Sequence, residues 1–420
     1  MKAKHIRKRM LFAAVLCILF YCMFVISHDI SKKQNAQMEK ESIKETGLTL
    51  YYTNENFSGF INKAAEEYKK EKGITVKAQL VSTSEYLENI AAGSTNGDES
   101  TPDLYIVREE LLENAYALGI TSENKIDKFN EDNFAKTALD SVSYHGRKIA
   151  YPLCFHTACF VYRSDLISMP SYLEQIDTCD ISSLAENGME KSIDFNTGNI
   201  LCEYAFIGKY INVGGDAGDA SEVMQIDEDM VRKSMMFYQQ LITDTGISPE
   251  AKEESMILGY AEGKNLSLIL SSDYIKLLDD YTKNMGTVYA LAQIPNLTEA
   301  LQSITGSYTD SVVVNGMSVN QDEAADFAEF LTCEYSDKLF SMTNIYPAKY
   351  DSGKSIDNFD VIYNIYKNSD TFPKLLKTED FSLKVKELFE NVSNGQDTMT
   401  EVSTFSAFLM SCWYGRYGVQ

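Results

Sequence analysis

The chain has 420 residues, too many for one ordinary hydrophobic core, so two lobes or domains are expected. Its content of 44% apolar and 24% charged residues excludes an intrinsically disordered chain. Its formal charge of −23 at neutral pH argues against nucleic acid and anionic lipid as partners, because both are polyanions.

Residues 1 to 33 predict export. Five basic residues precede an apolar run at residues 10 to 26, which is the order found in targeting segments. The run has 17 residues, so cleavage as a signal peptide and retention as an N-terminal membrane anchor both remain open. A lipid anchor is disfavoured because Cys17 and Cys22 follow large side chains. Residues 34 to 46 predict a polar linker, which would leave the folded part secreted or on the outer face of the cytoplasmic membrane.

The cysteines beyond residue 33 are widely spaced and form no CxxC pair. They are Cys154, Cys159, Cys179, Cys202, Cys333 and Cys412. Cys154 and Cys159 would point to opposite faces of a continuous strand, so the set predicts buried free thiols rather than a local disulfide. A zinc site is not expected, because only His145 and His156 remain beyond the leader, and no cofactor is predicted.

Residues 47 to 107 alternate between strand-like and helix-like patterns. Residues 47 to 53 predict a strand, and residues 57 to 72 predict an amphipathic helix with one apolar stripe. Residues 74 to 81 predict a second strand, residues 84 to 92 a helix with a Ser cap, and residues 103 to 107 a third strand. This order predicts a parallel sheet covered by helices. Ligands bind such sheets beyond the carboxyl ends of their strands.

The stretch at residues 141 to 165 predicts a connection between two halves of the chain. His145-Gly146 is a tight-turn signal between short extended runs at residues 141 to 144 and 148 to 153. Residues 157 to 162 are apolar and rich in β-forming types. A short hairpin followed by a departing strand is what a crossover between two lobes would look like.

The rest of the chain predicts further alternation of helices and strands. The expected elements are helices at 199–210, 231–243, 251–259, 322–332 and 381–392, and strands at 264–271 and 311–314.

Several runs occur in the order and spacing of one protein family. They are GLTLYYTNENFSGFINKAAEEYKKEKGITVKAQ, SEYLENIAAGS, TPDLYIV, SVSYHGRKIAYPLCFHTACFVYRSDL, GYAEGKNLSLILSSDY and DEAADFAEFLTCEYSDKLF. From about residue 45 to about residue 415, the chain resembles the extracellular solute-binding proteins of ABC importers, in the maltose-binding-like family 1 group. The resemblance implies a two-lobed α/β fold of the periplasmic-binding-protein type II, with a ligand cleft at the hinge. Lobe one would comprise residues 47–156 and 296–344, and lobe two residues 157–295 and 345–420.

The resemblance implies ligand-binding side chains in lobe one. Tyr52, Asn54 and Glu55 have the position of the family's first ligand loop, with a helix-entry turn as the alternative. Arg108 follows the third strand, where a solvated helix start is the alternative. His156 lies where the hairpin enters the hinge strand, and a satisfied structural histidine is the alternative there. Such planar polar groups and aromatic rings suit the hydroxyl pairs and C–H faces of a sugar.

The resemblance also implies ligand groups from lobe two. Asp216 follows a glycine pair similar to one that borders the family's cleft, although a role in loop geometry is the alternative. Ser272, Asp273 and Tyr274 occupy the place of a Gly-Pro-aromatic run in the family. Tyr274 keeps the ring whereas Asp273 adds a hydrogen-bond acceptor, so the identity of the ligand stays open.

Three further candidates lie where the chain would cross back between the two lobes. Tyr308 and Asp310 precede the predicted strand at 311–314, and Tyr346 lies at the second crossing. Half-buried packing is the alternative for each tyrosine.

The function implied is a non-catalytic, monomeric receptor that captures a carbohydrate and delivers it to a membrane ABC permease. A secreted glycoside-active enzyme remains an alternative, although no GxSxG motif occurs and no motif places a carboxylate pair. A ligand sensor with the same fold, acting on a membrane signalling partner, is the other alternative.

Overall fold

The computed structural model describes residues 47–98, 101–177, 188–220, 222–247, 251–374 and 378–417. The predicted leader and linker and Cys179 lie outside these ranges. Within them, no helix combines the length and the apolar character that crossing a membrane requires.

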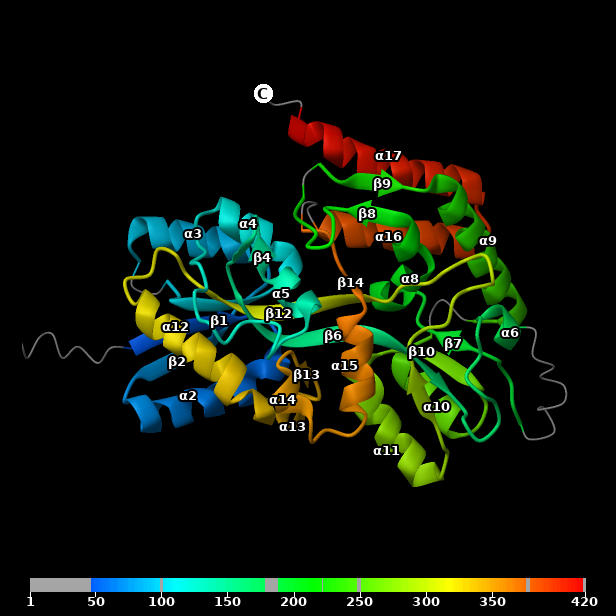
Figure 1. The fold of residues 1–420 in the computed structure, drawn as a ribbon, viewed down its shortest axis with the longest axis horizontal. Coiled ribbons are helices and arrows are strands. Elements are labelled where there is room, and N and C mark those ends of the chain that lie inside the picture. Colours follow the sequence, from blue (N-terminus) through cyan, green and yellow to red (C-terminus); the bar gives the residue numbers. More distant parts are fainter. Residues whose placement is uncertain are drawn as a thin grey trace, which may run out of the picture.

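A ten-stranded mixed sheet runs through the centre of the molecule (Figure 1). Seven strands follow the order β2-β1-β3-β12-β6-β10-β7, while β11 and β13 pair with β6 and β14 pairs with β12. The strands are β1 (Gly47–Tyr52), β2 (Thr75–Leu80), β3 (Leu104–Arg108), β6 (Tyr151–Tyr162), β7 (Asp194–Phe195), β10 (Ser267–Ser271), β11 (Ala290–Ala292), β12 (Gly306–Val314), β13 (Tyr346–Pro347) and β14 (Asp370–Thr371).

Helices cover both faces of the sheet. In Figure 1, α2 and α10 to α15 lie below it, whereas α3, α4 and α5 lie above its left part and α8, α9, α16 and α17 above its right part. The helices are α2 (Ser58–Lys72), α3 (Tyr86–Asn96), α4 (Leu112–Ala117), α5 (Lys136–Ser141), α6 (Glu174–Asp177), α8 (Ile200–Ile207), α9 (Glu228–Thr245), α10 (Glu253–Ala261), α11 (Ile275–Met285), α12 (Gln321–Glu329), α13 (Leu339–Thr343), α14 (Tyr350–Gly353), α15 (Phe359–Lys367), α16 (Thr378–Ser393) and α17 (Thr398–Tyr417).

The core is shared below the sheet and divided above it. The shared core contains Leu50 of β1 as well as Leu268 of β10. Above the sheet, one cluster contains Val313 of β12, and a second cluster has Tyr308 of the same strand packed against it. We call these the first-lobe core and the second-lobe core. Asp310 lies between them along β12, so polar groups occupy the boundary of the two lobes.

The predicted start of the fold is confirmed. β1 pairs in parallel with both β2 and β3, and α2 buries its apolar stripe against them. Gly73 ends α2 with φ of 76°, a conformation that glycine adopts without strain. The expected Ser cap of the next helix is wrong. α3 follows Glu85, which has φ of 50° and makes no side-chain cap.

The crossover is simpler than the sequence suggests. Residues 136 to 141 form α5, so the hairpin shrinks to β4 (Ser143–Tyr144) and β5 (Arg147–Lys148). His145 and Gly146 both have positive φ at its turn, as a two-residue hairpin of this kind requires. The two later extended runs merge into the single strand β6. Pro152 lies next to a β-bulge of this strand, where Leu153 has no register partner on β12.

β6 belongs to both halves of the molecule. Its first half pairs with β12 and β13, and its second half pairs with β10 and β11. After β13 the chain stays below the sheet, because α15 packs against β6 in the shared core. The chain reaches the second-lobe core at Phe372.

The described cysteines confirm the expected free thiols. Cys154, Cys159, Cys202 and Cys333 are buried, and none of the four forms a disulfide.

Candidate ligand-binding site between the lobes

The carboxyl ends of β3 and β10 meet where β6 pairs with β12. Arg108 ends β3 and lies opposite Asp310, while Tyr308 lies opposite His156. Asp273 follows β10 directly and reaches the same point. Five side chains that are separated by up to about 200 residues therefore form one polar cluster, which we call the crossing cluster.

His156 lies between two carboxylates at the centre of the crossing cluster. Its Nδ1 is 2.6 Å from Asp273 Oδ1, and its Nε2 is 3.2 Å from Asp310 Oδ2. Burial opposes the charge of His156, but Asp273 and Asp310 raise the pKa of its imidazole well above the ordinary value. Burial opposes the charge of Asp310 as well, yet His156 and Arg108 hold the pKa of that carboxyl below its usual range.

Tyr308 holds two cations in place. Its ring stacks on the ring of His156 with centroids 4.5 Å apart, and the Arg108 guanidinium carbon lies 3.8 Å from the Tyr308 ring centre. Both faces of the ring are therefore covered, so Tyr308 orients its neighbours rather than offering a free face to a ligand.

The outer groups of the crossing cluster are those that solvent reaches. The side chains of Arg108 and Asp273 are 41% and 32% exposed, whereas His156 and Asp310 are 5% and 11% exposed. Arg108 Nε is 3.8 Å from Asp310 Oδ1, which is an ion-pair distance beyond hydrogen-bond range, and this buried N–H has no hydrogen-bond partner among the described residues. An arginine fork beside an exposed carboxylate can bind adjacent hydroxyl groups as donor and acceptor.

Ser272 and Tyr274 flank the crossing cluster without projecting into it. Ser272 is buried, and its hydroxyl accepts a hydrogen bond of 3.1 Å from the Thr157 N–H. The ring of Tyr274 is partly buried against the shared core. The N-cap side chain at this turn is Ser271, which accepts from the Asp273 N–H.

The first-loop candidates lie apart from the crossing cluster, because β3 and β12 separate β1 from β6 in the sheet. Tyr52 is buried and donates to Ser58 Oγ at 3.0 Å. Asn54 caps a short 3₁₀ turn by accepting from the Asn56 N–H, and Glu55 is exposed. The helix-entry geometry is therefore present.

Asp216 and Tyr346 also lie elsewhere. The side chain of Asp216 is 90% exposed, 3.9 Å from Lys136 Nζ, and borders a cavity of about 190 Å³. The ring of Tyr346 is buried between Phe155 and Phe340. Neither side chain reaches the crossing cluster in this conformation.

A second polar cluster joins the lobes beside β12. Glu109 is fully buried, and its carboxylate accepts from the N–H groups of Thr309 at 2.9 Å and Phe372 at 3.2 Å. The buried Lys374 donates to the Asp140 and Ser143 carbonyls. Burial raises the pKa of Glu109 and lowers that of Lys374, and each charge offsets part of the other's shift. Lys374 gave little signal in the sequence beyond being one cation among apolar neighbours.

Comparison with known proteins places the fold. Neither a protein-family model nor a curated protein matches the sequence. Among solved structures, an extracellular solute-binding protein from Staphylococcus aureus in complex with maltose superposes with a TM-score of 0.73 at 17% identity, over 88% of this chain and 98% of that one. The chain has the two-lobed fold of the extracellular solute-binding proteins. The predicted fold class is thus confirmed.

Two more structures share the solute-binding-protein fold. A cyclo/maltodextrin-binding protein complexed with maltotetraose has a TM-score of 0.70 at 16% identity, covering 88% of this chain and 97% of that one. The maltose-binding periplasmic protein MalE from Listeria monocytogenes, in complex with maltose, has a TM-score of 0.66 at 18% identity, covering 86% and 97%. The resemblance seen in the sequence is therefore confirmed at the level of the fold.

Proposed function

We propose that the chain is an exported, non-catalytic receptor that captures a carbohydrate between its lobes and delivers it to a membrane permease. The observation that carries the proposal is the crossing cluster, which gathers an arginine, two carboxylates and a tyrosine where β3 and β10 end. Carboxyl strand ends at a lobe boundary are where ligands of α/β proteins bind. The three structural neighbours, all solved with a maltose-type sugar, support the same class of solute.

Hydrogen bonds between the two lobes support capture of the ligand by lobe closure. The His145 N–H donates to Asp219 Oδ2 at 2.7 Å, joining the β4–β5 hairpin to the loop after β8 (Ile211–Val213). Lys374 adds contacts to Asp140 and Ser143 on the opposite lobe. A ligand that contacts both lobes makes all of its contacts only when the lobes are closed. Such a ligand would therefore stabilise the closed arrangement relative to an open one.

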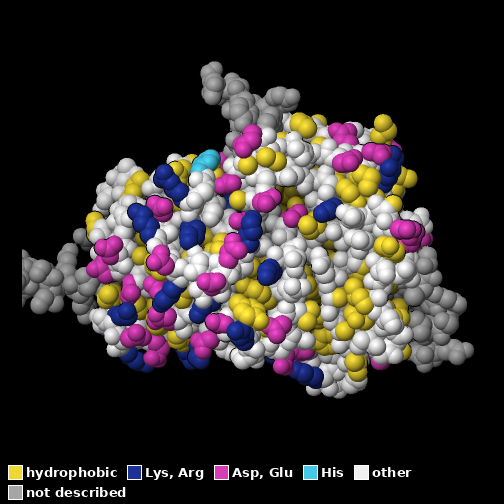
Figure 2. All heavy atoms as spheres, viewed as in Figure 1, with side chains coloured by type: hydrophobic (Ala, Val, Ile, Leu, Met, Phe, Trp, Pro, Cys, Tyr) yellow, Lys and Arg dark blue, Asp and Glu magenta, His cyan; other side chains and the backbone are white. Residues whose placement is uncertain are grey.

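The surface suits a neutral solute better than a polyanion. Figure 2 shows acidic side chains scattered over the visible face with basic ones between them, rather than one basic patch. With a formal charge of −23, the chain offers no electrostatic attraction to nucleic acid.

The test is binding of a maltodextrin series and a panel of other sugars to the full-length chain in mild detergent. We expect one sugar class to bind with Kd near ~1 μM by calorimetry, which is ordinary for capture receptors, and to reduce the radius of gyration in X-ray scattering. Arg108→Ala should weaken binding by about 10- to 100-fold, the equivalent of a lost charged hydrogen bond.

Arg147→Ala is the matched control, because Arg147 is exposed on the β4–β5 hairpin outside the crossing cluster. It should bind like the wild type. The absence of any binding or compaction across the panel would refute the proposal, and release of reducing sugar would favour a glycoside-active enzyme instead.

A further inference from the structure

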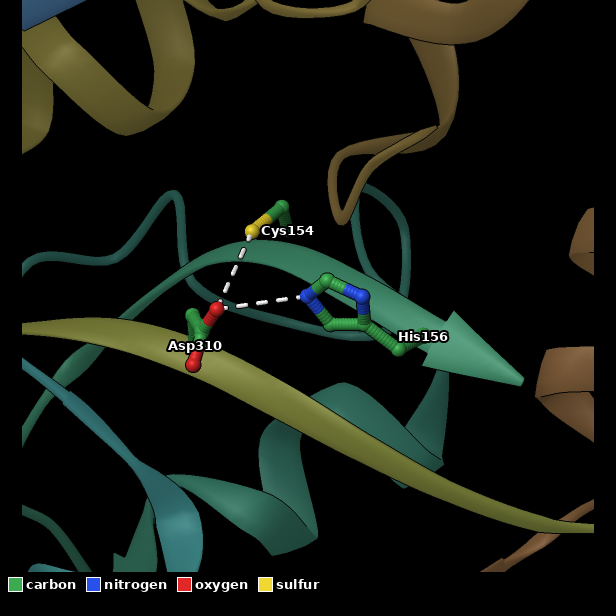
Figure 3. A group of neighbouring side chains, drawn as sticks. All are labelled: Cys154, His156 and Asp310. Atoms are coloured by element: carbon green, nitrogen blue, oxygen red, sulfur yellow. Dashed lines mark hydrogen bonds and ion pairs between the residues drawn. The ribbon is translucent and has the colours of Figure 1, made fainter. Parts of the chain in front are cut away.

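Cys154, His156 and Asp310 bring three metal-ligating groups together inside the protein (Figure 3). One ligand atom from each, a sulfur, an imidazole nitrogen and a carboxylate oxygen, lies within 4.8 Å of the other two, and all three residues are buried. Asp310 Oδ2 is 3.2 Å from His156 Nε2 and 4.0 Å from Cys154 Sγ. Modest contraction about a central ion would place these atoms at the spacing of ligands on one cation.

The strand geometry presents the three groups together on a rigid frame. Cys154 and His156 are two residues apart on β6, so their side chains leave the same face of the sheet. Asp310 is the register partner of Cys154 on the antiparallel strand β12, so its side chain leaves the sheet on the same face as that of Cys154. Figure 3 shows the three side chains converging from these two strands.

Asp273 supplies the outer carboxylate that metal-binding histidines commonly have. It lies 2.6 Å from His156 Nδ1, on the side of the ring away from Asp310. This contact fixes the ring so that Nε2 points at Cys154 and Asp310, and it makes Nε2 a better donor to a metal.

We propose that Cys154, His156 and Asp310 bind one divalent cation of the zinc class. Mixed sulfur, nitrogen and oxygen donors suit Zn²⁺ and Co²⁺ rather than Ca²⁺ or Mg²⁺, which take oxygen ligands. Three protein ligands leave a fourth position for water. The scarcity of histidine does not exclude this site, because it uses only one. Because His156 and Asp310 also belong to the crossing cluster, metal binding is measured in the absence of sugar, so its outcome does not depend on the proposed carbohydrate capture.

The first test is a Co²⁺ titration of the chelator-treated full-length chain in mild detergent. We expect saturation at one equivalent, a thiolate-to-cobalt charge-transfer band in the near ultraviolet, and loss of the band on adding Zn²⁺. Cys154→Ser should abolish the band, whereas Cys159→Ser should keep it, because Cys159 is a free, buried thiol of the same strand that lies outside the group of three ligands. No band in the wild type, or an unchanged band in Cys154→Ser, would overturn the proposal.

A second test needs no variant of a ligand. Calorimetry of Zn²⁺ binding to the chelator-treated chain should show one tight site per chain. Several weak sites and no tight one would assign the binding to surface carboxylates and overturn the site. Asp273→Asn should weaken Zn²⁺ binding by about 10- to 100-fold while leaving the cobalt spectrum unchanged. Unaltered affinity would remove Asp273 from its positioning role.

Discussion

At the scale of single residues, Glu203 has an unusual environment. It lies on α8 with no exposed surface, and neither of its carboxylate oxygens has a hydrogen-bond partner among the described residues. Burial raises the pKa of Glu203 well above its ordinary value, and the nearby charge of Glu390 adds to this. The folded protein therefore holds Glu203 in its neutral, protonated form.

Glu203→Gln should stabilise the protein in a pH-dependent way. Below about pH 4.3 the unfolded chain also keeps this proton, so wild type and variant should differ little. At higher pH the unfolded wild type releases the proton and the folded form does not, which costs the wild type about 1.4 kcal/mol per pH unit up to the folded pKa. Urea unfolding should show an advantage for Glu203→Gln that is near zero at pH 4 and grows steadily as the pH rises to 7.

The control is Glu66→Gln, on an exposed face of α2, which should leave the free energy of unfolding nearly unchanged at each pH. An advantage of Glu203→Gln that is equal at pH 4 and pH 7 would mean that Glu203 is already ionised in the folded state.

The crossing cluster shows what residue-level reasoning can and cannot predict. Arg108 and Asp273 were found because each follows an apolar strand, and strand ends are visible in the sequence. The role of Tyr308 was not visible, because its ring is covered by two cations that come from β3 and β6. The metal-ligand geometry was missed for a related reason: Asp310 joins Cys154 only through the register of two strands that are about 150 residues apart.

At the scale of elements, Glu109 ties three segments together. Its two oxygens accept from β12 and from the segment after β14, while its own backbone begins the 3₁₀ turn that directly follows β3. Lys374, in that same segment, carries the compensating charge. The end of β3 and the chain's entry into the second-lobe core are therefore linked by one buried pair.

Removing both Glu109 and Lys374 should cost less than the sum of the two single removals. Glu109→Gln and Lys374→Met should each destabilise the protein by about 3 to 5 kcal/mol, because each leaves the other charge buried without compensation. The double variant should lose clearly less than the sum of the two. Chemical denaturation of the four proteins gives this double-mutant cycle. Strict additivity would show that Glu109 and Lys374 act separately.

β6 shows why the elements near the crossover were only partly predicted. The β-forming residues of its two halves were recognised, and so was the turn at His145 and Gly146. The merging of the halves into one strand depends on partners from β10, β12 and β13, which local sequence does not contain. The predicted Ser cap is absent, because the residue that precedes α3 is Glu85 in a left-handed conformation, which local sequence did not indicate.

At the scale of the whole molecule, the hydrogen bond from the His145 N–H to Asp219 Oδ2 joins the two lobes. Asp219→Ala should favour the open form and weaken sugar binding by about two- to fivefold, as expected from a net hydrogen bond of about 0.5 to 1 kcal/mol at an exposed position. Calorimetry of the sugar identified in the binding panel measures the affinity, and scattering of the sugar-free protein measures the opening.

Asp219→Asn is the matched variant, because its amide oxygen can still accept from His145. It should retain most of the affinity. Equal losses of sugar affinity in Asp219→Asn and Asp219→Ala would assign the effect to the charge of Asp219 rather than to its hydrogen bond with His145.

The sequence predicted the two-lobed architecture because alternating strands and helices, in a familiar order, are local patterns. It did not predict how far the lobes share structure. Below the sheet, Leu50 and Leu268 belong to one core, although they come from opposite ends of the strand order.

The shared strand β6 has a consequence for how this molecule can be divided. A cut between His156 and Thr157 would leave each half with an unpaired edge where β6 had been an interior strand. Each half would also expose its side of the shared core. Neither lobe is therefore expected to fold alone, and the chain should unfold as one cooperative unit.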